Sequence, residues 1–268
     1  MRSLSGSLLV AFLSAACFFG PQVFCANAQR HAGPSVMVND EGVPEFLDSI
    51  HVPALQNAPF SAIVHSEWIK PLDGGGTYTT VNQRRIARDS LGRIYEERWS
   101  LVPKDGTAQS QMNVIQIANP VERTLYNCFL HPLPRQCSLQ KYAETPMAAY
   151  HPAVGHSGPL PNGKGFRIHE DLGIRSFEGV DALGTRDTTT YNQGVIGNDT
   201  RFSVMREFWF AEKLGIDLQV EISNPLFGKE IFTITDLSAA EPDPALFQLP
   251  EGFTVVDQRK PATSSPDQ

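Results

Sequence analysis

The sequence predicts a mainly β (α+β) fold, a strongly curved antiparallel sheet or half-barrel of about ten strands with few short helices. The first observation is that polar and apolar residues alternate with a period of two from Pro59 onward, which is typical of half-buried strands. The second is that short segments rich in Gly, Pro, Asn and Asp separate these stretches and favour hairpin turns. Because so large a sheet must twist and curl, we expect one of its faces to be concave.

The first half of the predicted sheet is an antiparallel meander, because its connections are only a few residues long. Its expected strands are residues 59–72, 78–89, 93–102, 113–118 and 123–130. Residues 143–165 interrupt the pattern as a long loop rich in Pro, Gly and His. Loops of this length without regular structure are uncommon and often carry function.

Strands return in the second half, at residues 179–191, 202–210, 216–222 and 230–237. The strand 202–210 is apolar on both faces, so we expect it in the middle of the sheet. Strict alternation in the next strand assigns its aliphatic residues to one face, namely Ile216, Leu218, Val220 and Ile222. Phe208 and Trp209 are adjacent, so one of them should face this row and the other should be covered on the opposite face.

Residues 1–28 have the parts of a signal peptide, with Arg2, an apolar stretch at 8–19 and the sequence Ala26-Asn27-Ala28 for cleavage. We therefore expect a periplasmic or secreted protein cleaved near Ala28. The expected organisation continues with an irregular N-terminal segment at 29–58, including a short helix at 43–50. A single curved-sheet domain follows at 59–258, and a disordered tail at 259–268.

The chain carries a formal net charge of −7, which argues against a nucleic-acid partner and against docking on anionic lipid. No segment after the signal peptide is apolar enough to be expected to cross a membrane. Lipidation at Cys17 or Cys25 is disfavoured because the residues before each cysteine fit a lipobox poorly.

Cys128 and Cys137 are the two cysteines that remain after cleavage. An isolated pair in an oxidising compartment is most simply a disulfide, and the intervening segment resembles a hairpin loop. We expect their Cα atoms to lie about 4.4–6.8 Å apart. A zinc or redox pair is the alternative, but it lacks the C-x-x-C spacing and further thiols.

No catalytic residue, metal ligand or cofactor site is predicted. Gly155-His156-Ser157-Gly158 lacks the second glycine of a nucleophile elbow, because Pro159 stands in its place. His151, His156 and the run His169-Glu170-Asp171 have ligand chemistry without the spacing of a metal site. Two adjacent charged pairs, Arg84-Arg85 and Glu96-Glu97, should each divide between the two faces of a solvated strand.

Aromatic and aliphatic side chains at strand positions are the candidates for lining a ligand cavity on the concave face. They are Trp68, Trp99, Phe208, Trp209, Leu218 and Val220. An ordinary hydrophobic core is the alternative for each of these residues.

The last third of the chain, residues 202–257, resembles the superfamily of lipoprotein carriers and receptors that includes LolA, LolB and RseB. The resemblance is carried by Glu207-Phe208-Trp209-Phe210, the strands 218–222 and 231–237, and the ending Phe-x-x-Pro-x-Gly-apolar-x-Val-apolar-Asp at 247–257. It implies a half-barrel with helices over its concave face and an apolar cavity for acyl chains. This sequence departs from that pattern in its few helical segments and in the loop 143–165.

The resemblance implies a non-enzymatic envelope protein that binds an apolar ligand or a lipidated partner in a concave sheet. An RseB-like module that binds or senses an envelope protein is the first alternative, and a secreted hydrolase is the second. A cavity open to solvent and lined by apolar residues would favour the carrier, and a filled core with an exposed apolar patch would favour the protein-binding module. A buried His–acid pair beside a hydroxyl would favour the hydrolase. The ligand, the partner and the oligomeric state are not predicted by the sequence.

Overall fold

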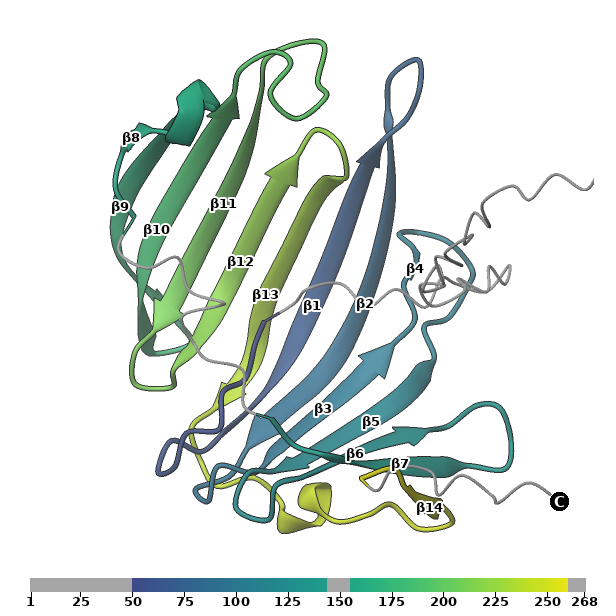
Figure 1. Ribbon diagram of the computed structural model, residues 1–268. Helices are drawn as coiled ribbons and strands as arrows, with labels where there is room; N and C mark the ends of the chain where they lie inside the picture. Colours follow the sequence, from purple (N-terminus) through teal and green to yellow (C-terminus); the bar gives the residue numbers. More distant parts are fainter. Residues whose placement is uncertain (1–49, 144–154, 260–268) are drawn as a thin grey trace, which may run out of the picture. The chain divides into compact units, whose positions relative to one another are not determined.

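The computed structural model describes residues 50–143 and 155–259 (Figure 1). The expected signal peptide, residues 43–49 of the expected helix, residues 144–154 of the expected loop and residues 260–268 of the expected tail lie outside the described residues. The boundaries expected at residues 28, 58 and 258 stay predictions.

The described strands form one 14-stranded sheet that is open and curved, which confirms the predicted fold class (Figure 1). Their order across the sheet is β14-β7-β6-β5-β3-β2-β1-β13-β12-β11-β10-β9-β8, with β4 beside β2. All neighbours pair antiparallel except β14 and β7, which are parallel. The strands are β1 (Phe60–Pro71), β2 (Thr77–Arg88), β3 (Ile94–Trp99), β4 (Val102–Pro103), β5 (Met112–Asn119), β6 (Thr124–Phe129), β7 (Gln136–Lys141), β8 (Gly158–Pro159), β9 (Gly165–Phe177), β10 (Val180–Tyr191), β11 (Phe202–Ala211), β12 (Ile216–Asn224), β13 (Gly228–Ser238) and β14 (Thr254–Asp257). Two 3₁₀ turns, η2 (Pro161–Gly163) and η3 (Pro244–Phe247), are the helical elements of the described chain.

Alternation in the sequence located most of these strands, but β7, β8 and β9 were not predicted, and β8 and η2 lie in the segment 143–165 that was expected to be a loop. β9 lies near one edge of the sheet and most of its side chains are exposed, so its sequence shows little apolar alternation. Its register also shifts at Gly184 of β10, which breaks the period of two. In β7 the buried residues are Cys137, Ser138 and Leu139 in succession, so alternation is absent there as well.

The side chains of β1 alternate between the two faces of the sheet. The packed face carries Phe60, Ala62 and Val64, each at most 3% exposed, and the second face carries Ile63 and His65. The packed face continues through a buried core over the neighbouring strands, with Ile86, Ile94, Leu218, Val220, Phe232 and Ile234. Ile50 and Val52 from the segment before β1 belong to the same core, so residues 50–58 are irregular but packed.

Arg88 joins three segments beneath the packed face. It is fully buried, and its guanidinium donates to the carbonyl oxygens of Pro53 (2.9 Å), Ala58 (2.7 Å) and Leu214 (2.5 Å). Its charged group also lies 5.1 Å from the ring of Phe60. Burial lowers the pKa of Arg88 to about 10, so the side chain is still charged at neutral pH. One side chain thus ties the N-terminal segment and the β11–β12 turn to the end of β2.

Arg84 corrects the expectation of a solvated strand at Arg84-Arg85. The two residues do divide between the faces, but Arg84 is only 4% exposed and lies in the packed face. Burial lowers its pKa to about 10, with Glu96 acting in the opposite direction. Its guanidinium donates to the carbonyl oxygen of Ile50 at 3.5 Å, so the first described residue is also held by an arginine.

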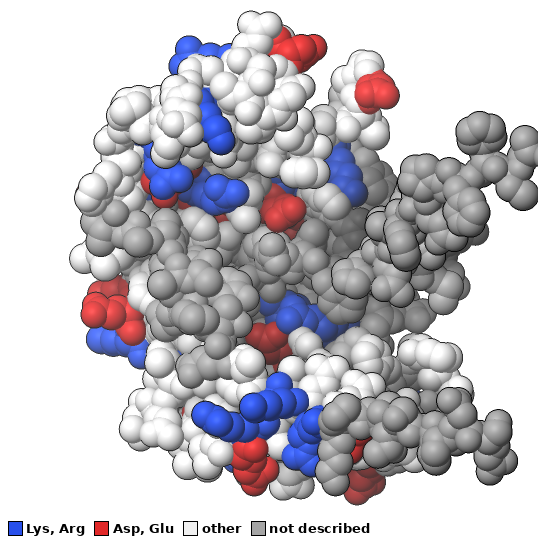
Figure 2. All heavy atoms as spheres, in the orientation of Figure 1, with Lys and Arg blue, Asp and Glu red and all other residues white. Residues whose placement is uncertain are grey.

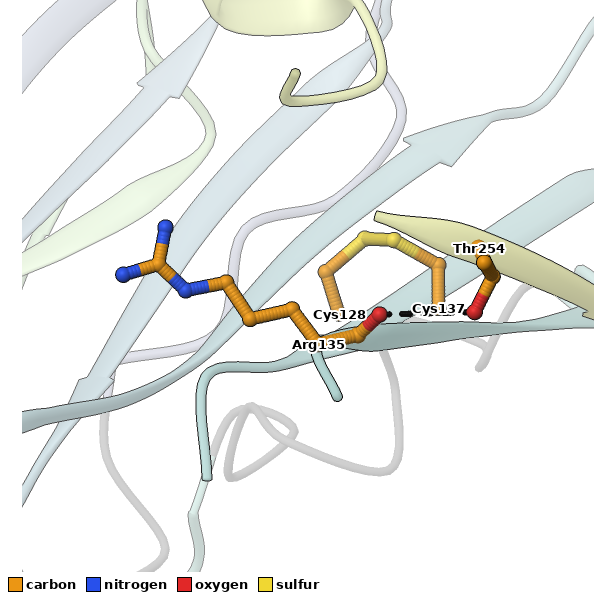
Figure 3. The surroundings of a disulfide bond; sticks show 4 residues. All are labelled: Cys128, Arg135, Cys137 and Thr254. Atoms are coloured by element: carbon orange, nitrogen blue, oxygen red, sulfur yellow. Dashed lines mark hydrogen bonds between the residues drawn. A yellow bond between two sulfur atoms is a disulfide. The ribbon is translucent and has the colours of Figure 1, made fainter. Parts of the chain in front are cut away.

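The predicted disulfide between Cys128 and Cys137 is present (Figure 3). The cysteines face each other directly in the β6–β7 pair, and their Cα atoms are 3.9 Å apart, closer than the expected range. Direct opposition in an antiparallel pair brings Cα atoms closer than most other disulfide geometries do. Beside it, the hydroxyl of Thr254 lies 3.4 Å from the Arg135 carbonyl oxygen, where β14 begins (Figure 3).

A second, smaller core lies over the disulfide on the second face. Phe247 from η3 is 8% exposed there and packs with Tyr95, Ile117 and the two cysteines. Leu246 and Phe253 extend the contact. We call residues 239–253, which connect β13 to β14 across this face, the C-terminal strap.

Replacing Arg88 tests its role as the joint between these segments. We expect Arg88→Met to lower the free energy of unfolding by about 3–5 kcal/mol, because three buried carbonyl groups lose a charged donor. Arg206→Met is the matched control, since Arg206 is exposed on β11 and should change stability by less than about 0.5 kcal/mol. Urea unfolding of the oxidised protein measures both, and equal effects would show that Arg88 is not the joint.

Asp217 predicts a pH dependence of stability. It is 7% exposed, and burial raises its pKa to about 7. Below about pH 4 the carboxyl is protonated in both states, whereas between about pH 4 and pH 7 only the unfolded chain releases the proton. Asp217 therefore lowers stability progressively over this interval, by roughly 4 kcal/mol at most.

Asp217→Asn should remove this loss, so the variant gains stability relative to the parent protein as the pH rises from about 4.5 to 7.5. Asp181→Asn is the control, because Asp181 is exposed on β10. Urea midpoints at the two pH values give the comparison. A gain for Asp217→Asn that does not change with pH would contradict the raised pKa.

Candidate functional site

The larger described cavity, of about 780 Å³, lies on the second face across β13, β1, β2 and β3. We call it the groove. Its side chains alternate along each strand with those of the packed face, which explains why it adjoins a filled core. Its lining combines apolar and polar residues, namely Ile63, His65, Glu67, Val81, Gln83, Arg85, Glu97, Trp99, Val102, Lys104, Asp105, Ser110, Ile231 and Thr233, with Ser66, Asn82 and Arg84 beneath them.

Polar side chains in the groove are held by defined partners. Lys104 pairs with Glu67 at 2.9 Å, and this hydrogen bond raises the pKa of the lysine. The His65 Nε2 atom is hydrogen-bonded to Thr235 Oγ1 at 2.8 Å. The groove therefore presents fixed hydrogen-bonding groups between apolar side chains, and its chemistry is amphipathic.

Glu97 anchors the wall formed by β3. Its carboxylate accepts hydrogen bonds from the Tyr95 hydroxyl (2.9 Å), the Trp99 indole N–H (2.8 Å) and the Arg85 backbone N–H (3.1 Å). Burial and the neighbouring Glu97 raise the pKa of Tyr95, so the phenol remains a donor. Glu97 thus fixes the orientation of the Trp99 ring that lines the groove.

A second cavity, of about 400 Å³, lies beside the groove against the C-terminal strap. Pro242, Asp243 and Leu246 of the strap form one wall, and Ser61, Ala62, Ile63, Arg85 and Asp236 form the other. Ile63 and Arg85 line both cavities, so the two spaces meet at these residues.

The strap is attached to the sheet at several points. The Glu241 carboxylate accepts from the Ser90 backbone N–H at 3.2 Å, and Asp243 caps η3 by accepting from the Ala245 N–H at 2.9 Å. The guanidinium of Arg93 lies 5.0 Å from the ring centre of Phe247. These contacts hold the strap over the second face.

Of the side chains predicted to line a ligand cavity, Trp99 is the one that lines either cavity described here. Leu218 and Val220 are at most 5% exposed in the packed core. Trp68 lies near the β12–β13 turn, where its indole N–H donates to the Phe227 carbonyl at 2.9 Å and Lys70 lies over its ring. A ligand-binding role for these residues stays a prediction.

β11 lies between β10 and β12 and is thus an interior strand, but it stands fourth from the β8 edge rather than in the middle of the sheet. Phe208 is paired with Val220 and shares its face, whereas Trp209 is paired with Gln219 on the other face. Trp209 is 7% exposed there, with Phe177 at 6.0 Å and the Arg175 guanidinium at 4.0 Å from its ring. One aromatic therefore faces the aliphatic row and the other is covered, as the alternation predicts.

Most of the groove residues were not predicted from the sequence, notably His65, Gln83, Lys104 and Thr233. Alternation in β1 and β2 places His65 and Gln83 on one face, so a weak signal was present. Their proximity to Thr233 depends on the pairing of β1 with β13, which a pattern along the chain does not reveal.

Beyond the groove, charged side chains on β10 to β13 neutralise one another. Arg186 pairs with Glu207 at 2.7 Å, and Lys229 pairs with Glu221 at 2.8 Å. Burial opposes ionisation of Glu207, but hydrogen bonds from Trp209 and Arg186 lower its pKa overall. Figure 2 shows basic and acidic side chains side by side, without a broad region of one sign on the side in view.

His169 is the residue closest to a catalytic arrangement. Its Nδ1 lies 2.8 Å from Asp187 Oδ1, and its Nε2 lies 3.5 Å from the exposed Asp171. The Ser157 hydroxyl accepts from the His169 backbone N–H at 2.9 Å and has no hydrogen bond with the imidazole. Among the described residues, the hydroxyl and the histidine therefore do not form a nucleophile–base pair.

No group of three or more His, Cys, Asp or Glu side chains in residues 50–143 and 155–259 is arranged to hold a metal ion. Within the same residues, no helix has both the length and the apolar character needed to cross a membrane.

No family profile matches the sequence, and no curated protein matches it. Solved structures do match. A MucB structure is 16% identical, with a TM-score of 0.35, over 74% of this chain and 60% of that one. The MucA/MucB complex of Pseudomonas aeruginosa gives 16% identity and a TM-score of 0.36, over 75% of this chain and 59% of that one.

A LolA superfamily protein from Nitrosomonas europaea is 8% identical, with a TM-score of 0.27, over 74% of this chain and 99% of that one. The matched structures thus include the superfamily that residues 202–257 resemble, and at these identities the likeness concerns the fold alone. The chain spans about three fifths of the length of the MucB structures.

Glu97→Gln tests the anchor of the groove wall. We expect it to lower the free energy of unfolding by about 1–3 kcal/mol, because three donors lose a charged acceptor. Glu170→Gln is the control, since Glu170 is an exposed carboxylate on β9 that pairs with Arg186 at 3.9 Å. Its loss should stay below about 1 kcal/mol. Chemical denaturation gives both values, and equal losses would refute the anchoring role.

Proposed function

We propose that this chain is an exported, non-enzymatic binding protein that takes an extended polypeptide segment of a partner in the groove. The observation that carries the proposal is the lining of the groove, where fixed hydrogen-bonding side chains alternate with Ile63, Val81 and Trp99. An extended peptide presents the same alternation, with backbone polar groups between side chains that point to opposite sides.

The filled core of the packed face also supports a peptide ligand rather than an acyl chain. An acyl-chain carrier needs an apolar space, whereas the aliphatic row of β12 is buried among core side chains. Leu218 is fully buried and Val220 is 5% exposed. A filled core is one of the two features expected of an RseB-like protein-binding module, and the amphipathic groove takes the place of the expected exposed apolar patch.

An apolar ligand or a lipidated partner is the second candidate. Ile63, Val81, Trp99 and Ile231 give the groove an apolar component against which an acyl chain could pack. A hydrolase is not proposed, because Ser157 and the His169 ring are not hydrogen-bonded.

Filling the groove tests the proposal. Thr233→Trp places a large ring in the groove and should weaken binding of fluorescent, end-blocked nonapeptide pools at least tenfold, measured by polarisation. Thr188→Trp is the matched control, a half-buried mid-strand threonine on β10 that lines neither cavity, and it should leave binding unchanged.

A fluorescent fatty acid is measured beside the peptide pools on the same three proteins. Peptide binding that Thr233→Trp removes would support the proposal. Fatty-acid binding without peptide binding would replace it with the carrier function, and binding of neither probe would overturn both.

A further inference from the structure

Arg85 occupies a distinctive position in the groove, because it lines both cavities at the point where they meet. It is exposed on the second face, and its backbone N–H is engaged with Glu97. Its guanidinium makes no hydrogen bond or ion pair with any residue in the described ranges, unlike Lys104, which is paired with Glu67. Among the described residues that line the groove, Arg85 is therefore a cation whose side-chain donors remain available.

Both carboxylate oxygens of Glu97, which also lines the groove, accept hydrogen bonds from other groups. Glu97 accepts three hydrogen bonds, two of them on the oxygen that faces the Arg85 backbone. A guanidinium with free donors matches a carboxylate bidentately, and such charge-assisted pairs are stronger than neutral hydrogen bonds. The position of Arg85 thus favours a ligand carboxylate at the junction of the two cavities.

Acidic residues lie on both sides of this junction. Asp105 lines the groove, while Asp236 and Asp243 line the cavity against the strap. Additional negative charges on the ligand, before or after the central carboxylate, would meet these side chains and be repelled. The arrangement therefore selects one carboxylate with neutral or basic neighbours and disfavours an acidic run.

We propose that Arg85 is a specificity-determining residue that binds a single Glu or Asp side chain in the middle of a bound peptide segment. The segment passes from the groove, beside Trp99, into the cavity against the C-terminal strap. This inference rests on the proposed function, and it adds the sequence pattern of the partner.

The test compares end-blocked nonapeptide pools that differ at the central position, with neutral residues elsewhere. With the parent protein, the pool with central Glu should bind about tenfold more tightly than the pool with central Gln. Placing Asp at both ends of the central-Glu peptides should weaken binding severalfold. Fluorescence polarisation at low and high salt measures each affinity.

Substitutions separate the role of Arg85 from general charge. Arg85→Gln should abolish the preference for central Glu, so that the central-Glu and central-Gln pools bind the variant with equal affinity. Arg85→Lys should keep part of the preference, because an ammonium supplies charge without the planar fork. Arg206→Gln is the control, an exposed arginine on β11 that lines neither cavity, and it should keep the full preference.

The outcomes distinguish the two proposals. If both pools bind equally and Thr233→Trp still removes binding, the groove binds peptides but the inference about Arg85 is wrong. If the preference for central Glu survives in Arg85→Gln, another residue supplies it and the inference is again wrong. If no pool binds the parent protein, the proposed function itself fails.

Discussion

The buried guanidinium of Arg88 is the interaction on which the rest of the structure depends. It bonds carbonyl groups from the segment before β1 and from the β11–β12 turn, and these lie far apart in the chain. Because those backbone groups are buried, each would cost free energy without a donor. The arginine compensates for the irregular backbone at this end of the sheet. Regular strands can then continue from β1 and β12 with their alternation intact.

The packed face and the second face have different roles because the strands between them alternate without interruption. Where β1 alternates without interruption, Val64 faces a closed core and His65 faces the groove. A rigid packed face holds the groove side chains in place from behind, which limits the entropy lost when a ligand binds. The small core under Phe247 gives the strap a similar support. Binding surface and core are therefore opposite sides of the same strands.

The sequence predicted the parts of the fold that depend on local pattern. Alternation identified β1, β2 and β11, and it placed Phe208 and Trp209 on opposite faces. The expected oxidising compartment and the isolated pair Cys128 and Cys137 predicted the disulfide. The sequence did not predict β9, where most side chains are exposed. It also did not predict the burial of Arg84, because the sequence does not show which segment covers a charge.

The groove was not predictable in the same way. Its members come from β1, β2, β3 and β13 and from the connection after β3, so they meet only through long-range pairing. Of the residues predicted to line a ligand cavity, Trp99 lies in the groove. The other candidates do not, because aromatic or aliphatic character alone does not distinguish a core position from a cavity position. Arg85 could be placed on a face by alternation, but its available donors become visible only when the partners of its neighbours are known.

The pairing of β1 with β13 also governs when the sheet can assemble. His65 and Thr235, which meet across this pair, are separated by 170 residues. Contacts of such sequence separation form slowly, because a long loop must close before they contribute. The centre of the sheet therefore cannot form until β13 has been synthesised, about 170 residues after its partner β1.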